Sequence, residues 1–376
     1  MGKKTINLGI DKFNQIPRGL GGYNAKPREI EFETGALFHH YYLMKYGEDS
    51  CPTVDYEYER FLANRRDWRF QGAGIGRDKE SKRNVSNELA KAFTRWFLYT
   101  YEQLTYFAPF EDQFKMGYAS GHRWKKKEDG DLPDFLCGAN ATDIRLAEAK
   151  GRYSSVSFTN ADFESFRQQI KRVVLEDAGG KPTSVKGYVS ACQWATENTP
   201  RTKTKLLVED PDTEGEVQLE GRYPHDIGRR MIAHHYVSVL ERLMLPAHAE
   251  ALQHSLTISE SIGHSLSVWE VNVGPLKGMH FVGGLLPYQD AVTSNYCMCR
   301  GWGRSSLFLQ PPATIFAVEE NIFKKVLLLC NAGIDAVHEI PILETPDEFT
   351  TRMTVLRDGT LLSPDSYLRW VGEIEI

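Results

Sequence analysis

The stretch "LPDFLCGANATDIRLAEAKGR" (residues 132–152) decides how the fold of this chain is interpreted. It contains Pro133-Asp134, a turn-rich gap, and an apolar segment that ends in Glu148-Ala149-Lys150. Apolar and other residues alternate in "DIRLAEAKGRY", which predicts a strand with Ile144, Leu146, Glu148 and Lys150 on one face. The last two would then lie about 6 to 7 Å apart at Cα.

Composition limits the class of protein. With 376 residues, 41% of them hydrophobic, the chain can bury a substantial core as two domains or one large domain with a subdomain. No apolar run is long enough for a membrane span or a secretory signal, so we expect a cytoplasmic protein with no membrane partner. The formal charge of −5 means that any nucleic-acid contact must come from local basic patches. Cys297-Met-Cys299 alone is weak evidence for zinc.

The order of predicted elements is helix, three strands, helix, strand. Residues 86–104 carry a helical apolar stripe that Ser86 or Asn87 can cap. The Gly-rich and charged segment before it, residues 69–83, is typical of a connector or mobile loop. Strands follow within residues 106–119, 131–138 and 143–153, then a helix within 159–180 that Thr159 or Asn160 caps, and a buried strand within 184–195.

The remaining sequence extends this arrangement. Residues 226–247 predict another amphipathic helix, and from about residue 250 the pattern becomes mainly β. We therefore expect an α/β (α+β) protein whose central mixed sheet is flanked by helices. The predicted regions are residues 1–78, of unknown role, a core at 79–248, and a β-rich domain or subdomain at 249–376.

Two carboxylates and a lysine at strand ends suit phosphodiester hydrolysis. Carboxylate oxygens are good ligands for Mg²⁺, which takes further ligands from water and substrate phosphate. Such an ion polarises the phosphoryl oxygen, and a nearby lysine can orient water or stabilise the transition state. The plainer interpretation is a solvated strand end, where Glu148 and Lys150 form an exposed ion pair and Pro133-Asp134 begins a turn.

At these residues the sequence resembles the PD-(D/E)XK nuclease superfamily, which includes restriction endonucleases. The resemblance covers roughly residues 84–195. It implies a restriction-endonuclease-like core and Mg²⁺, or Mn²⁺, held by Asp134, Glu148 and the carbonyl of Ala149. It also implies that Lys150 is the catalytic lysine. Glu88 holds the place of an acidic residue in the preceding helix, and Gln168 or Gln169 that of a helper in the following helix. Arg172 and Val173 stand where RecB-type members have tyrosine.

Three basic stretches are candidates for phosphate contacts. "HRWKKK" (residues 122–127) is expected in the loop just before the Asp134 strand, and Trp124 there could stack on a base. "FRQQIKR" (166–172) and "ANRRDWRF" (63–70) are further clusters, and each can equally be a solvated face. The predicted nucleic-acid contacts are Arg123, Trp124, Lys125, Lys126, Lys127, Arg167 and Lys171.

The leading hypothesis is a metal-dependent nuclease, with DNA favoured over RNA and endonuclease over exonuclease action. Association with the superfamily suggests the effector of a restriction or phage-defence system. Such an effector could form a homo-oligomer or bind a protein partner in a multi-component system. One alternative is a catalytically inactive, nuclease-like protein that binds nucleic acid or assembles complexes. Another is a β-rich interaction protein that works through residues 250–376.

Overall fold

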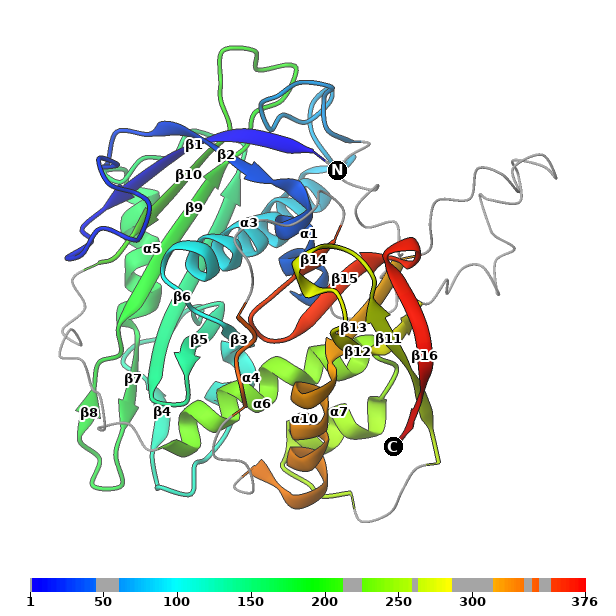
Figure 1. The fold of residues 1–376 in the computed structure, drawn as a ribbon. Helices are drawn as coiled ribbons and strands as arrows, with labels where there is room; N and C mark the ends of the chain where they lie inside the picture. The colour runs from blue at the N-terminus through cyan, green and yellow to red at the C-terminus, as the bar shows by residue number, and fades with distance from the viewer. Residues whose placement is uncertain are drawn as a thin grey trace. The chain divides into compact units, whose positions relative to one another are not determined.

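The computed structural model describes residues 2–44, 61–211, 225–258, 263–285, 314–334, 340–344 and 353–376 (Figure 1). The chain divides into two compact units. The large unit consists of residues 2–41 and 58–235, and the small unit of residue 1, 42–57 and 236–376. This division differs from the predicted boundaries at residues 78 and 248, because the N-terminal strands belong to the same sheet as the predicted core.

A mixed seven-stranded sheet organises the large unit. Neighbouring strands run parallel in the pairs β1–β10 and β6–β9 and antiparallel in the others. The strand order across the sheet is β2 (Arg28–Glu33), β1 (Lys3–Asp11), β10 (Lys205–Glu209), β9 (Gly187–Gln193), β6 (Asp143–Arg152), β5 (Phe135–Asn140) and β3 (Tyr106–Pro109). The predicted mixed sheet is confirmed.

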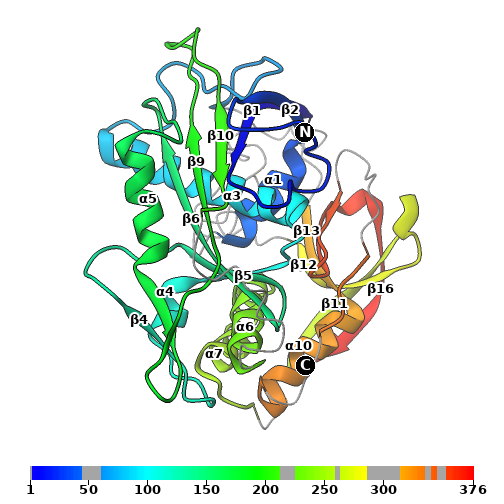
Figure 2. The same cartoon turned by 90° about the vertical axis from the view of Figure 1, so that its left-hand side faces the viewer.

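Helices α3 (Lys79–Tyr101) and α5 (Ala161–Lys171) cover opposite faces of this sheet (Figure 2). A Cβ on Gly151 of β6 would lie 1.9 Å from the Ser86 carbonyl oxygen of α3, and one on Gly187 of β9 would lie 2.3 Å from Ile170 of α5. Gly151 pairs with Cys192, five residues after Gly187, so the two glycines face opposite sides. Strand β6 is therefore covered on both faces.

Helix α3 begins earlier than its apolar stripe suggests. Asp78 is the N-cap, and its side chain accepts a hydrogen bond from Ser81 N at 2.8 Å. The prediction that residues 79–83 belong to a connector was wrong. The first turns are polar, whereas the buried apolar residues begin only at Leu89.

Three further predictions needed correction. Helix α5 has the predicted Asn160 cap but ends at Lys171, because the β-branched residues after it form the buried strand β7 (Val173–Glu176). The basic segment 122–127 is mostly strand and not loop: β4 (Arg123–Lys126) pairs with β7, which also pairs with β8 (Pro182–Thr183). The first predicted strand region, 106–119, contains β3 and also the short helix α4 (Phe110–Phe114).

Among its described residues, the small unit contains a six-stranded antiparallel sheet and two α-helices of its own. Helices α1 (Thr34–Met44) and α6 (His225–Arg242) each continue from one unit into the other along the chain. The sheet order is β14 (Thr354–Val355), β15 (Thr360–Pro364), β13 (Thr314–Glu319), β12 (His280–Leu285), β11 (Ser265–Val271) and β16 (Leu368–Glu375). Helices α7 (Pro246–His254) and α10 (Glu320–Ala332) contact each other.

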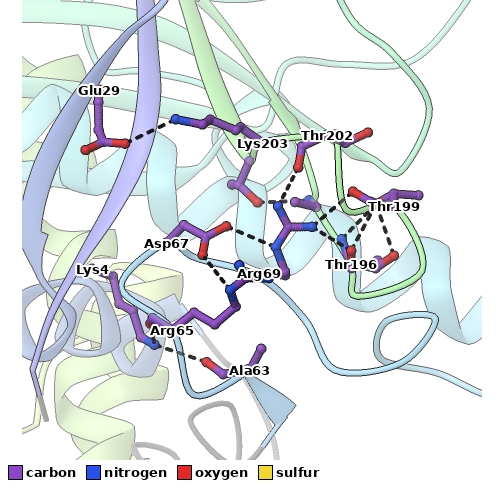
Figure 3. Close-up of polar contacts among 12 residues, drawn as sticks. Lys4, Glu29, Ala63, Arg65, Asp67, Arg69, Thr196, Thr199, Thr202 and Lys203 are labelled. Atoms are coloured by element: carbon purple, nitrogen blue, oxygen red, sulfur yellow. Dashed lines mark hydrogen bonds and ion pairs between the residues drawn. The ribbon is translucent and has the colours of Figure 1, made fainter.

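A buried arginine fixes the loop between β9 and β10 (Figure 3). Arg69 is 3% exposed and donates hydrogen bonds to the backbone oxygens of Thr196, Thr199 and Thr202 at 2.7, 3.0 and 2.6 Å. Its Nε donates to Asp67 Oδ2 at 3.0 Å. The guanidinium thus satisfies several backbone acceptors at once, as its forked donors allow.

Replacing Arg69 by Met should destabilise the fold strongly. The substitution leaves Asp67 and the three carbonyls without this donor, so we expect a loss of about 3 kcal/mol in the free energy of unfolding. R65M is the matched control, because Arg65 is 60% exposed and lies 3.7 Å from the same aspartate, and it should cost under about 0.5 kcal/mol. Urea unfolding of both variants measures these changes. Equal losses of unfolding free energy would contradict the role of Arg69 in holding the loop between β9 and β10.

Candidate active site

The antiparallel pair β5–β6 brings the two halves of the sequence motif together. Phe135 pairs with Ala147, which places Asp134 beside Glu148 and Ala149 just before β5 begins. Ala149 N donates to Asp134 Oδ2 at 2.9 Å. A strand residue directs its N–H and C=O to the same neighbour, so the Ala149 carbonyl also points past the start of β5 toward Asp134. The three predicted metal-ligating groups therefore converge.

Glu148 is fully buried. Its Oε1 lies 2.6 Å from Lys150 Nζ, and within the described ranges no group donates a hydrogen bond to Oε2. Burial, and then the negative charge of Asp134, raise the pKa of Glu148 well above 4.5, although Lys150 opposes the shift. The prediction of an exposed strand-end ion pair, which was the plainer interpretation, is wrong for Glu148.

Lys150 connects this buried cluster to solvent. Its side chain is 27% exposed. Burial alone would lower the pKa of its ammonium group, but Glu148 and then Asp134 raise that pKa above 10.5. The ammonium is accordingly a permanent positive charge near neutral pH in this arrangement.

A second lysine, which the sequence did not reveal, completes the cluster. Lys91 of α3 places Nζ 2.7 Å from Asp134 Oδ1. One turn earlier on the same helix, Asn87 Oδ1 accepts a hydrogen bond from Gly151 N at 3.2 Å. The available signal was their i, i+4 spacing on one face of the predicted helix. Two carboxylates therefore face two ammonium groups.

The two helper residues implied by the resemblance have different outcomes. Glu88 is exposed and accepts a hydrogen bond from Tyr41 OH at 3.1 Å, whereas Asn87 and Lys91 are the α3 residues that reach β6 and Asp134. The placement of Glu88 at the cluster is thus not supported, because it lies on another face of α3. Gln169 is 6% exposed, and across the part of the chain that is described its Nε2 has no hydrogen-bond partner.

The β4 residues that we predicted to contact nucleic acid mostly bind other groups of the protein. Trp124 is 5% exposed, donates from Nε1 to Tyr118 OH at 2.9 Å and packs its ring against Phe110, so it cannot stack on a base. Arg123 and Lys125 both bind Glu176, at 2.9 and 2.7 Å. They project from one side of β4, and Trp124 from the other.

Of the remaining predicted cations, some bind other groups of the protein and some are exposed. Lys126 donates to the Gly130 carbonyl oxygen at 2.7 Å, and Lys127 and Lys171 are exposed. Arg167 lies 2.6 Å from Glu209, whose side chain is fully buried. The assignment of Arg167 to phosphate binding is corrected, because its guanidinium neutralises a buried carboxylate.

A groove of about 1540 Å³ opens beside Lys150. It is bounded by residues 77–87 of α3 and the segment before it, by residues 150–154 at the end of β6, and by α5. Gln169 lines it, as do six basic residues besides Lys150 that were not predicted: Arg77, Lys79, Lys82, Arg83, Arg152 and Arg172. The first four were missed because their segment was interpreted as a connector, and the other two because they come from distant segments.

The donor set fits a hard divalent cation. Asp134, Glu148 and the Ala149 carbonyl provide oxygen ligands, and Glu148 Oε2 is a buried carboxylate oxygen that accepts no hydrogen bond from the described residues. The described ranges contain no cluster of three or more His, Cys, Asp or Glu side chains suited to a metal. Magnesium tolerates such a sparse set because it keeps several waters. Cys297-Met-Cys299 lies outside the described residues.

Comparisons with known proteins give no further information about the site: no protein family, curated protein or solved structure matches the chain. Among the described residues, no helix is both long and apolar enough to cross a membrane.

Replacing Glu148 by Gln should change the pH dependence of stability in metal-free buffer. Because the folded-state pKa of Glu148 exceeds 4.5, its contribution to stability is lost as pH rises from about 4.5 through the folded value. The unfolding free energy of E148Q should therefore improve relative to the unmodified protein by up to about 1.4 kcal/mol per pH unit in that window. Urea unfolding in EDTA at several pH values measures it. A difference that is constant with pH would refute the shift.

Proposed function

We propose that the large unit is a metal-dependent nuclease that hydrolyses phosphodiester bonds, with DNA as the favoured substrate and endonuclease action favoured. The observation that carries the proposal is the buried carboxylate of Glu148, which lies beside Asp134 and Lys150 and whose Oε2 accepts no hydrogen bond from the described residues. Burying a carboxylate near another is costly unless a cation compensates. Such costly clusters are typical of functional sites.

The arrangement of elements supports the resemblance to PD-(D/E)XK nucleases. Helix α3, strands β3, β5 and β6, helix α5 and strand β9 follow one another in the expected order when the short helix α4 and the three-stranded sheet of β4, β7 and β8 are set aside. Asp134 precedes β5, and Glu148 and Lys150 lie on β6, as the motif requires. We therefore extend the proposal to a restriction-endonuclease-like core.

Each residue has a distinct role in this proposal. Asp134, Glu148 and the Ala149 carbonyl would hold Mg²⁺ or Mn²⁺, which acts as a Lewis acid that stabilises charge on the phosphoryl group. Lys150 lines the groove and directs a positive charge to the reacting phosphate. Lys91 neutralises Asp134 while the cation is absent. The Ala149 N–H fixes the orientation of the Asp134 carboxylate.

Single substitutions at the cluster should separate ligands from charge-stabilising groups. D134N and E148Q should abolish Mg²⁺-dependent cleavage of plasmid and linear DNA, because each removes an anionic oxygen ligand. K150M should lower the single-turnover rate by about 100-fold or more while metal binding is kept.

E88Q is the matched control for these variants, because Glu88 lies on the same helix as Lys91 but binds Tyr41. It should cleave at the unmodified rate. Full activity in folded D134N would eliminate this site, and a protein that binds DNA without cleaving it would favour the inactive, nuclease-like alternative. Thermal unfolding of each variant checks that the fold is intact.

A further inference from the structure

The walls of the groove beside Lys150 carry a local excess of positive charge. Seven of the lining residues are basic and three are acidic, although the chain as a whole has a formal charge of −5. One of the acids, Asp78, has its carboxylate engaged as the cap of α3. The groove therefore presents a positive potential that a polyanion would recognise.

Three of these cations stand out because their side chains have no partner in the described structure. Arg77, Lys79 and Arg83 are exposed and form neither an ion pair nor a side-chain hydrogen bond with any described residue, whereas Lys82 donates to the Ala73 carbonyl oxygen. Lys79 and Arg83 lie in the first turns of α3, where positive side chains oppose the helix dipole. Such an arrangement is unfavourable in the isolated protein, and a bound anion would offset it.

A second, independent feature points to a ligand in the groove. Gln169 is 94% buried, lines the groove from α5, and its amide Nε2 has no hydrogen-bond partner in the described ranges. A buried amide donor without a partner is costly, and an acceptor in the groove would satisfy it. Phosphate oxygens are such acceptors.

The lining also indicates how the ligand would be recognised. Its two aromatic residues are Phe166, which is buried under the guanidinium of Arg152, and Tyr153, which is half-buried against Gly74. Phe166 therefore offers no free face for stacking a base, and the Tyr153 ring is partly covered. A site that binds single strands usually combines cations with exposed aromatic rings, whereas a duplex keeps its own bases stacked.

We propose that this groove binds the phosphate backbone of duplex DNA next to the bond that is cut, without reading its sequence. Arg77, Lys79 and Arg83 contact phosphates, and Gln169 donates to one close to Lys150. The inference rests on the proposed nuclease function for the position of the cut bond beside Lys150. The binding itself requires no metal.

The test compares two triple variants that remove equal charge. R77S/K79S/R83S changes the groove. R123S/K125S/K127S, the β4 variant, changes two cations of β4 that are bound to Glu176 and the lysine that follows the strand. Fluorescence anisotropy with two unrelated duplexes and one single strand, in EDTA at several NaCl concentrations, gives the slope of log K against log salt.

Each phosphate contact contributes about 0.9 to that slope on duplex DNA. The groove variant should therefore flatten the slope by about 2 to 3 units, equally for both duplexes, and the β4 variant by less than about 1 unit. Q169L should weaken duplex binding without changing the slope, because it removes a neutral donor. Thermal unfolding should be unchanged for the groove variant. The β4 variant should unfold at a lower temperature because Glu176 loses both of its cations, so binding is measured where both variants are folded.

Other results would overturn the inference. An unaltered slope in the folded groove variant removes the groove from the binding surface, a loss confined to one duplex means base reading, and tighter binding of the single strand excludes duplex specificity. If the slope is unaltered but cleavage still requires Asp134, the groove inference fails and the nuclease proposal stands. If the slopes are as expected but the protein never cleaves DNA, the nuclease proposal alone is refuted.

Discussion

The hydrogen bond from Ala149 N to Asp134 Oδ2 is the constraint on which the site depends. Strand β5 has not yet begun at Asp134, so the aspartate side chain takes the place of a strand partner for β6. This contact fixes Asp134 beside the buried Glu148, and the two carboxylates then require positive charge nearby. Lys91 supplies it from α3, and Lys150 from β6 itself.

Local patterns in the sequence predicted the parts of this arrangement that depend on neighbours along the chain. The alternation in residues 143–153 predicted β6 and the shared face of Glu148 and Lys150, and the Asn160 cap predicted the start of α5. The motif spacing led to Asp134 because two adjacent strands joined by a short turn must lie side by side. These features follow from periodicity, capping and hairpin geometry.

Features that depend on packing between distant segments were not accessible in the same way. Trp124 looked available for stacking, but its alternation with Arg123 and Lys125 on a strand turns it inward. Glu88 and Lys91 are both polar positions of one helix, and only the orientation of α3 against β6 distinguishes them. Four of the seven groove cations lie within residues 77–83, a segment that was interpreted as a connector. The others come from β6 and from Arg172 just after α5, so the sequence did not display all seven as one cluster.

Anomalous scattering from crystals that contain Mn²⁺ would test the central claim most directly, because it locates the cation without relying on activity. The account predicts a peak within about 2.0 to 2.6 Å of carboxylate oxygens of both Asp134 and Glu148, and its loss in crystals of E148Q. Absence of a peak there, at a Mn²⁺ concentration that supports DNA cleavage in solution, would contradict it.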